Sequence, residues 1–117
     1  MTSRAIPISA HAVIEIIAAP ILMAAPLALG FSAGAAAVTF TLGAVLMGLA
    51  VTTATDERAI PLSAHAGFDY AFGILTIIAG VILAIRTANA AQTIFLAGFG
   101  AAHLALTAST RYSARGA

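Results

Sequence analysis

Long apolar runs divide the chain into four segments, separated by short stretches rich in glycine or polar residues. Each run approaches the ~20 residues with which a helix crosses a bilayer. The predicted helices span residues 9–29, 36–53, 63–85 and 91–110. The predicted connections are residues 30–34, 55–58 and 86–89. Strands of a membrane barrel would need ~10-residue segments that alternate polar and apolar side chains. These runs do not alternate, so the predicted fold class is all-α.

The composition indicates that lipid surrounds most of the chain. Of its 117 residues 62% are hydrophobic, the mean hydropathy is +1.07, and 8% are charged, against about 25% in a soluble domain. No charged residue occurs between Ile16 and Thr55. So few polar groups cannot cover a water-facing surface, and we predict a single integral membrane domain over residues 1–117. A net charge of +1 without any lysine leaves no basic patch for nucleic acid.

The chain repeats one helical hairpin in tandem. Residues 4–12 read RAIPISAHA and residues 58–66 read RAIPLSAHA, so eight of nine positions agree at a spacing of 54. The repeats extend over residues 4–55 and 58–110, with two predicted helices in each. Because two is an even number, both hairpins enter the membrane from the same side. We therefore predict a pseudo-two-fold axis along the membrane normal, in contrast to the inverted repeats of many transporters.

The arginines predict an orientation. Four of the five lie on the side of the chain ends and the central connection, and one lies on the other side. The four are Arg4, Arg58, Arg111 and Arg115, and the fifth is Arg86. Because cytoplasmic loops carry the excess of lysine and arginine, we predict that both termini face the cytoplasm.

Five ionisable side chains lie inside the predicted membrane helices. This polar cluster consists of His11, Glu15, His65, Asp69 and His103. In each repeat the acid follows its histidine by four residues, so the two side chains share one helix face. At a rise of ~1.5 Å per residue, Glu15 lies about 9 Å beyond Ser9, where its predicted helix begins. By the same rise, His103 lies about 12 Å before Arg111, which follows the last predicted helix. We expect all five at a similar depth in the cytoplasmic leaflet.

Three roles are open for the polar cluster. The first is structural, because buried hydrogen bonds between helices fix the register of the hairpins. The second is a metal or cofactor site, in which His11, Glu15, His65 and Asp69 supply two nitrogen and two oxygen ligands and His103 a fifth ligand. Helix bundles hold metals in this way. A histidine of the cluster could also ligate a tetrapyrrole, although no sequence feature selects that cofactor. The third is conduction of protons or ions, although the outer leaflet holds no acidic residue.

Small residues provide faces on which membrane helices approach closely. The candidate packing glycines are Gly43, Gly48, Gly73, Gly80 and Gly98. Their faces pack either within one bundle or against another subunit.

The motifs of soluble enzymes are missing from the sequence, which has no glycine-rich phosphate loop, nucleophile elbow or Cys–His pair. We therefore expect a non-catalytic protein. The predicted function is that of an accessory or structural subunit in a larger membrane complex or a homo-oligomer. Its partners are then the lipid bilayer and other membrane subunits or copies of itself. The alternative is a membrane protein that uses the polar cluster to bind a metal or cofactor or to move protons or ions.

Each repeat opens with a histidine followed four residues later by an acid, and Pro26 and Gly30-Phe31 end the first predicted helix. This layout resembles the SPW-repeat family of small bacterial and archaeal membrane proteins, in which Ser-Pro-Trp precedes Gly-Phe. Here Ala25-Pro26-Leu27 replaces that tripeptide, the second repeat reads Ala79-Gly80-Val81, and the chain has no tryptophan. The resemblance implies four transmembrane helices in the inner (plasma) membrane of a prokaryote. It implies no activity.

Overall fold

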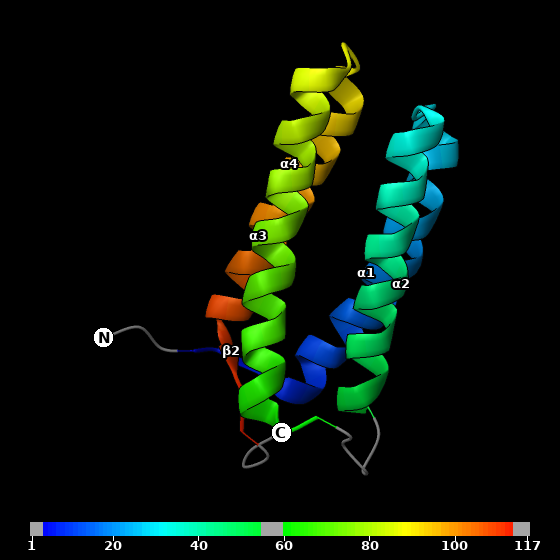
Figure 1. Cartoon of the computed structure of the whole chain (residues 1–117). Coiled ribbons are helices and arrows are strands. Elements are labelled where there is room, and N and C mark those ends of the chain that lie inside the picture. The colour runs from blue at the N-terminus through cyan, green and yellow to red at the C-terminus, as the bar shows by residue number, and fades with distance from the viewer. Residues whose placement is uncertain (1–3, 55–59, 114–117) are drawn as a thin grey trace.

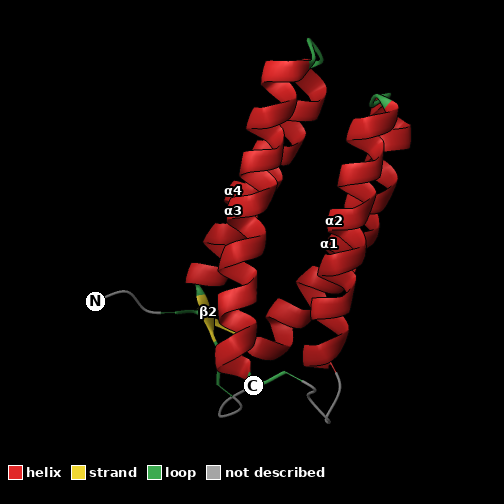
Figure 2. Ribbon diagram, in the orientation of Figure 1, coloured by secondary structure: helices red, strands yellow, loops and turns green. Residues whose placement is uncertain are grey.

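The structure, a computed structural model, describes residues 4–54 and 60–113. Four helices follow one another along this part of the chain, flanked by two short strands (Figures 1 and 2). The helices are α1 (Ile8–Leu29), α2 (Ala33–Ala54), α3 (Leu62–Arg86) and α4 (Ala90–Ala108), and the strands are β1 (Ile6–Pro7) and β2 (Thr110–Arg111). The predicted all-α class with four helices is confirmed. The connection expected at residues 55–58 lies outside the described residues, as does Arg115.

Local sequence explains several helix ends. α1 continues through both Pro20 and Pro26. It ends where Gly30 takes a φ of 67°, a left-handed conformation that favours glycine, and the Gly30 N–H donates to the carbonyl of Pro26. At the start of α4, the side chain of Asn89 accepts hydrogen bonds from two backbone N–H groups of the first turn.

The end of the last helix differs from the prediction. We predict a helix up to residue 110, whereas α4 ends at Ala108 and β2 begins at Thr110, after the capping residue Ser109. β2 pairs in parallel with β1, with Ile6 opposite Thr110 and Pro7 opposite Arg111. Two chain segments far apart in sequence satisfy each other's backbone groups in this way. A two-residue pairing leaves no trace in the pattern of apolar residues. It brings the segment before α1 beside the segment after α4.

Most contacts between helices fall within the two hairpins. α1 packs along α2 and α3 packs along α4, while the two hairpins touch each other much less (Figure 1). A small apolar core lies between them, made of Ala19, Leu22, Leu46, Phe72 and Leu96. A polar contact joins the two hairpin loops, where buried Gln92 accepts a hydrogen bond from the Ser32 N–H at 2.8 Å and donates to Thr87 Oγ1 at 2.9 Å.

The candidate packing glycines divide into two groups. A Cβ atom added to Gly43, Gly73 or Gly80 would meet atoms of the neighbouring helix of the same hairpin. Gly48 and Gly98 do not pack in this way, because no heavy atom among the described residues would lie within 4 Å of such a Cβ. The physical reason is helical geometry: at about 100° per residue, these two glycines point away from the face that packs.

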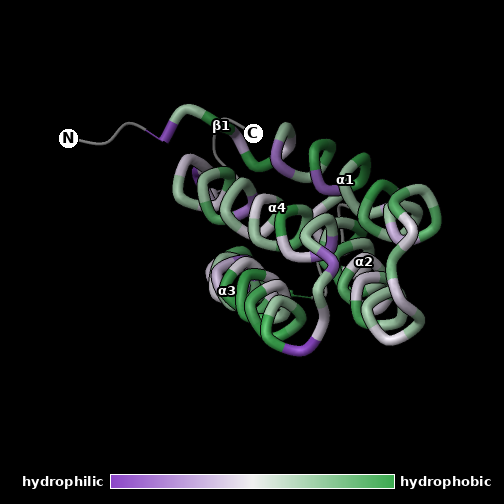
Figure 3. The backbone as a smooth tube through the Cα atoms, turned by 90° about the horizontal axis from the view of Figure 1, so that it is seen from above, coloured by the Kyte–Doolittle hydropathy of each residue, from purple (hydrophilic) through white to green (hydrophobic). Residues whose placement is uncertain are grey.

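The distribution of polarity differs from that in a water-soluble protein, with many polar side chains buried and many large apolar side chains exposed. Buried side chains include the whole polar cluster and several threonines, whose hydroxyls donate to backbone carbonyls of their own helices. Large apolar side chains are exposed, among them Leu27 at 88% and Ile85 at 81%. Figure 3 shows apolar residues along all four helices. Each helix is long and apolar enough to cross a membrane.

The close approach of α3 and α4 yields a first prediction. A Cβ on Gly100, which the sequence analysis did not single out, would lie 2.8 Å from the carbonyl oxygen of Gly73. We expect Gly100→Ala to lower the free energy of unfolding in detergent by about 1–3 kcal/mol through overpacking. Gly98→Ala is the matched control. It raises helix propensity by the same amount, but its added methyl group contacts no heavy atom of the described residues. Equal thermal stability of the two variants would contradict this packing.

Candidate metal centre

The structure brings the whole polar cluster to one place, at the end of the bundle that carries the two strands. Two members belong to α1, two to α3 and one to α4; in chain order they are His11, Glu15, His65, Asp69 and His103. The exposed fraction is 0% for the first four residues and 5% for the last. The four-residue spacing in each repeat places both side chains of a pair on the face that turns to the other hairpin.

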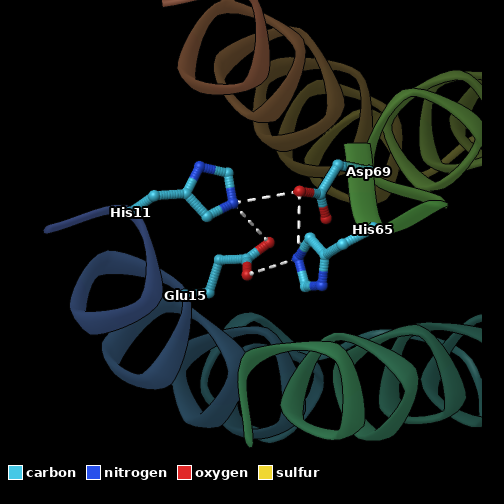
Figure 4. Close-up of side chains that lie close together, drawn as sticks. All are labelled: His11, Glu15, His65 and Asp69. Carbon is cyan, nitrogen blue, oxygen red and sulfur yellow. Dashed lines mark ion pairs between the residues drawn. The ribbon is translucent and has the colours of Figure 1, made fainter. Parts of the chain in front are cut away.

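Each histidine directs its Nε2 atom at both carboxylates. His11 Nε2 lies 3.2 Å from Glu15 Oε2 and 3.0 Å from Asp69 Oδ2. His65 Nε2 lies 3.4 Å from Glu15 Oε1 and 3.1 Å from Asp69 Oδ2 (Figure 4). His103 Nε2 is farther away, at 3.7 Å from Glu15 Oε2 and 3.6 Å from Asp69 Oδ1.

These short distances do not make a network of well-formed hydrogen bonds. Among the described residues, the Nε2 atoms of all three histidines and both oxygens of Glu15 lack a partner in hydrogen-bond geometry. Figure 4 shows four of the side chains turned toward one central space. Buried polar atoms normally have partners. A positive charge between these atoms, from protons or from a metal ion, would satisfy them together.

The spacing of the ligand atoms approaches that in the coordination sphere of a small divalent ion. His11, Glu15, His65 and Asp69 each offer one ligand atom such that all lie within 4.8 Å of one another. Four ligands about 2.0–2.1 Å from a tetrahedral ion are about 3.4 Å apart. The four shortest nitrogen–oxygen distances are 3.0–3.4 Å, with one oxygen of Glu15 facing His11 and the other facing His65. The donor set consists of imidazole nitrogens and carboxylate oxygens and contains no sulfur. Such a set is suited to zinc, iron or manganese.

A threonine outside the predicted cluster orients one histidine. Thr110 Oγ1 donates to the carbonyl of Leu106 at 2.6 Å, so the same oxygen accepts the hydrogen bond from His11 Nδ1 at 2.8 Å. Nδ1 of His11 therefore carries a proton, and in the neutral ring the lone pair is on Nε2, which faces the centre. Histidines that ligate metals are commonly held in this way by a partner on the other ring nitrogen.

Tyr112 is a second neighbour that the sequence analysis missed. Its hydroxyl donates to Asp69 Oδ2 at 2.6 Å, and its ring centroid lies 5.4 Å from that of His11. Burial, reinforced by this hydrogen bond, raises the pKa of Tyr112 above its usual range, which keeps the phenol protonated as a donor. Tyr112 and Thr110 reach the cluster because β2 pairs with β1. No motif marks either residue.

No family model, no curated protein and no solved structure matches this chain. The resemblance to the SPW-repeat family stays a prediction from the sequence. The functional argument therefore depends on the geometry of the polar cluster.

The contact between Thr110 and His11 leads to a second prediction. Thr110→Val keeps the shape of the side chain but removes the acceptor for His11 Nδ1, and an unsatisfied buried donor costs about 1–3 kcal/mol of folding free energy. We expect a lower unfolding midpoint in detergent. Thr41→Val is the control, because Thr41 is exposed and its hydroxyl bonds only to its own helix. Equal midpoints for both variants would argue against this role of Thr110.

Proposed function

We propose that the protein is an integral membrane protein that holds one divalent transition-metal ion at His11, Glu15, His65 and Asp69, with His103 as a more distant ligand. One observation carries the proposal: unpaired histidine nitrogens and carboxylate oxygens from both hairpins converge in a buried space. Charge balance supports it. Neutral histidines and two carboxylates carry a charge of −2, which one divalent cation neutralises.

The proposal places the four helices across the inner membrane of a prokaryote, with both ends in the cytoplasm. The exposed apolar side chains of all four helices support the membrane location. The pairing of β1 with β2 supports the placement of both chain ends on one side. A pseudo-two-fold relation between the hairpins is supported by the equivalent roles of His11 and His65, which lie 3.0 and 3.1 Å from the same oxygen of Asp69.

A second candidate function is that of an accessory subunit in which the polar cluster is purely structural. The observation in its favour is the sparse contact between the hairpins, which makes the cluster one of the few connections between them. With protonated histidines, attraction to the two carboxylates would join the hairpins without any metal. The two candidates differ in whether the folded protein retains a metal ion.

Metal analysis separates the two functions and provides a third prediction. The protein purified in mild detergent and dialysed against dilute Zn²⁺, Mn²⁺ or Fe²⁺ is expected to retain one ion per chain for at least one of these metals. A His11→Ala/His65→Ala double variant loses two ligands and is expected to retain almost none. Elemental mass spectrometry measures the stoichiometry.

Two further variants complete this test. Glu15→Gln keeps the size of the side chain and is expected to weaken metal retention without preventing folding. Gln92→Ala changes the polar contact at the other end of the bundle and is expected to leave metal retention unchanged. A folded wild-type protein without bound metal that is destabilised by Glu15→Gln would support the structural role and overturn the metal site.

A fourth prediction concerns the orientation. The chain contains no cysteine, so single cysteines introduced at exposed positions report directly on accessibility. In spheroplasts, a membrane-impermeant maleimide is expected to label Ala88→Cys, between α3 and α4, without lysis. Arg4→Cys, before β1, is expected to react only after the membrane is permeabilised. The reverse pattern would place the termini outside the cell.

A further inference from the structure

A small pocket lies between α1 and α4, beside the proposed metal site. Its volume is about 120 Å³. It is lined by Ile14, Ala18, Phe99, Ala102, His103 and Leu106. His103 is the only polar residue among them. Ile14 and Ala102 are exposed, so the pocket opens on the apolar outer surface of the bundle.

His103 connects this pocket to the polar cluster. Its Nε2 atom lies 3.6–3.7 Å from the carboxylate oxygens, whereas the nearest distances of the other two histidines are 3.0 and 3.1 Å. Its side chain is 3% exposed, while those of the other four members are fully buried. Metal sites that accept outside ligands keep a coordination position open. The weakest ligand of the cluster thus lies on the side of the pocket.

Comparison of the two repeats shows that the histidine beside the pocket belongs to the second repeat alone. Position 49 of the first repeat corresponds to position 103 of the second at the spacing of 54, and it holds Leu49. A second pocket, between α2 and α3, has a volume of about 210 Å³ and includes Leu49 and Ala71 in its lining. All its lining residues are apolar, and none belongs to the polar cluster. Of these two pockets, the one between α1 and α4 combines an apolar wall with a side chain of the polar cluster.

Resting on the metal site proposed above, we propose that the pocket between α1 and α4 admits a small neutral molecule from the bilayer to the metal ion beside His103. The ligand class is a neutral diatomic molecule such as nitric oxide or carbon monoxide. The lining offers no charged partner for an ionic ligand, whose burial would be costly. Its volume of about 120 Å³ suits a small molecule, since a cavity of about 150 Å³ holds benzene. Binding forms one coordinate bond, from a lone pair of the ligand to the ion.

The test uses the full chain in lipid nanodiscs, loaded with Fe²⁺ under anaerobic conditions. Iron content is measured first, and nitric oxide is then titrated while absorption and paramagnetic resonance report an iron–nitrosyl species. We expect one iron per chain and saturable binding of nitric oxide. Ala102→Phe fills the pocket and is expected to raise the apparent Kd for nitric oxide by about tenfold or more, with the iron content unchanged.

Ala71→Phe is the matched control, because it places the same side chain in the pocket between α2 and α3 and is expected to leave nitric oxide binding unchanged. If Ala102→Phe loses its iron, the smaller Ala102→Leu replaces it in the comparison. Iron binding without a nitrosyl species, or equal Kd values for the pocket variant and Ala71→Phe, would overturn the proposed access route and leave the metal site intact. Failure of the wild-type protein to bind iron would overturn the access route, whereas the metal site fails only if zinc and manganese are not retained either.

Discussion

The burial of two carboxylates, Glu15 and Asp69, is the constraint on which the rest of the structure depends. An ionised carboxylate among apolar helices costs at least about 2.5 kcal/mol on insertion scales, and it needs compensation from nearby groups. The compensating groups come from both hairpins, because His11 belongs to α1, His65 to α3 and His103 to α4. The hairpins therefore meet at this point although they share few other contacts.

The surroundings of the polar cluster follow from the same constraint. β1 and β2 pair at this end of the bundle. Their pairing places Thr110 within hydrogen-bond distance of His11, and Tyr112 within hydrogen-bond distance of Asp69. Both neighbours orient or satisfy polar atoms that would otherwise lie unpaired in an apolar interior. At the opposite end, Gln92 links the two hairpin loops by backbone and side-chain hydrogen bonds. Polar contacts thus join the hairpins at both ends of the bundle, and a small apolar core lies between these ends.

The two halves of the chain are similar in sequence but differ in chemistry. The histidine–acid pairs repeat, whereas His103 has Leu49 at the equivalent position. The pocket between α1 and α4 consequently contains a histidine side chain, and the pocket between α2 and α3 has a wholly apolar lining. Among the described residues, this difference between the repeats places a histidine of the polar cluster beside the pocket between α1 and α4.

The sequence by itself determined the four helices and the membership of the polar cluster, because both depend on local signals: long apolar runs, glycine and asparagine at helix ends, and ionisable residues where apolar ones are expected. Only the tertiary structure decided that the cluster converges and that Thr110 and Tyr112 join it. It also decided that Gly48 and Gly98 lie away from the other described helices. These features depend on contacts between segments up to 99 residues apart. Helical periodicity constrains the faces of each helix, but the rotation and separation of two hairpins are set by the side chains that meet between them.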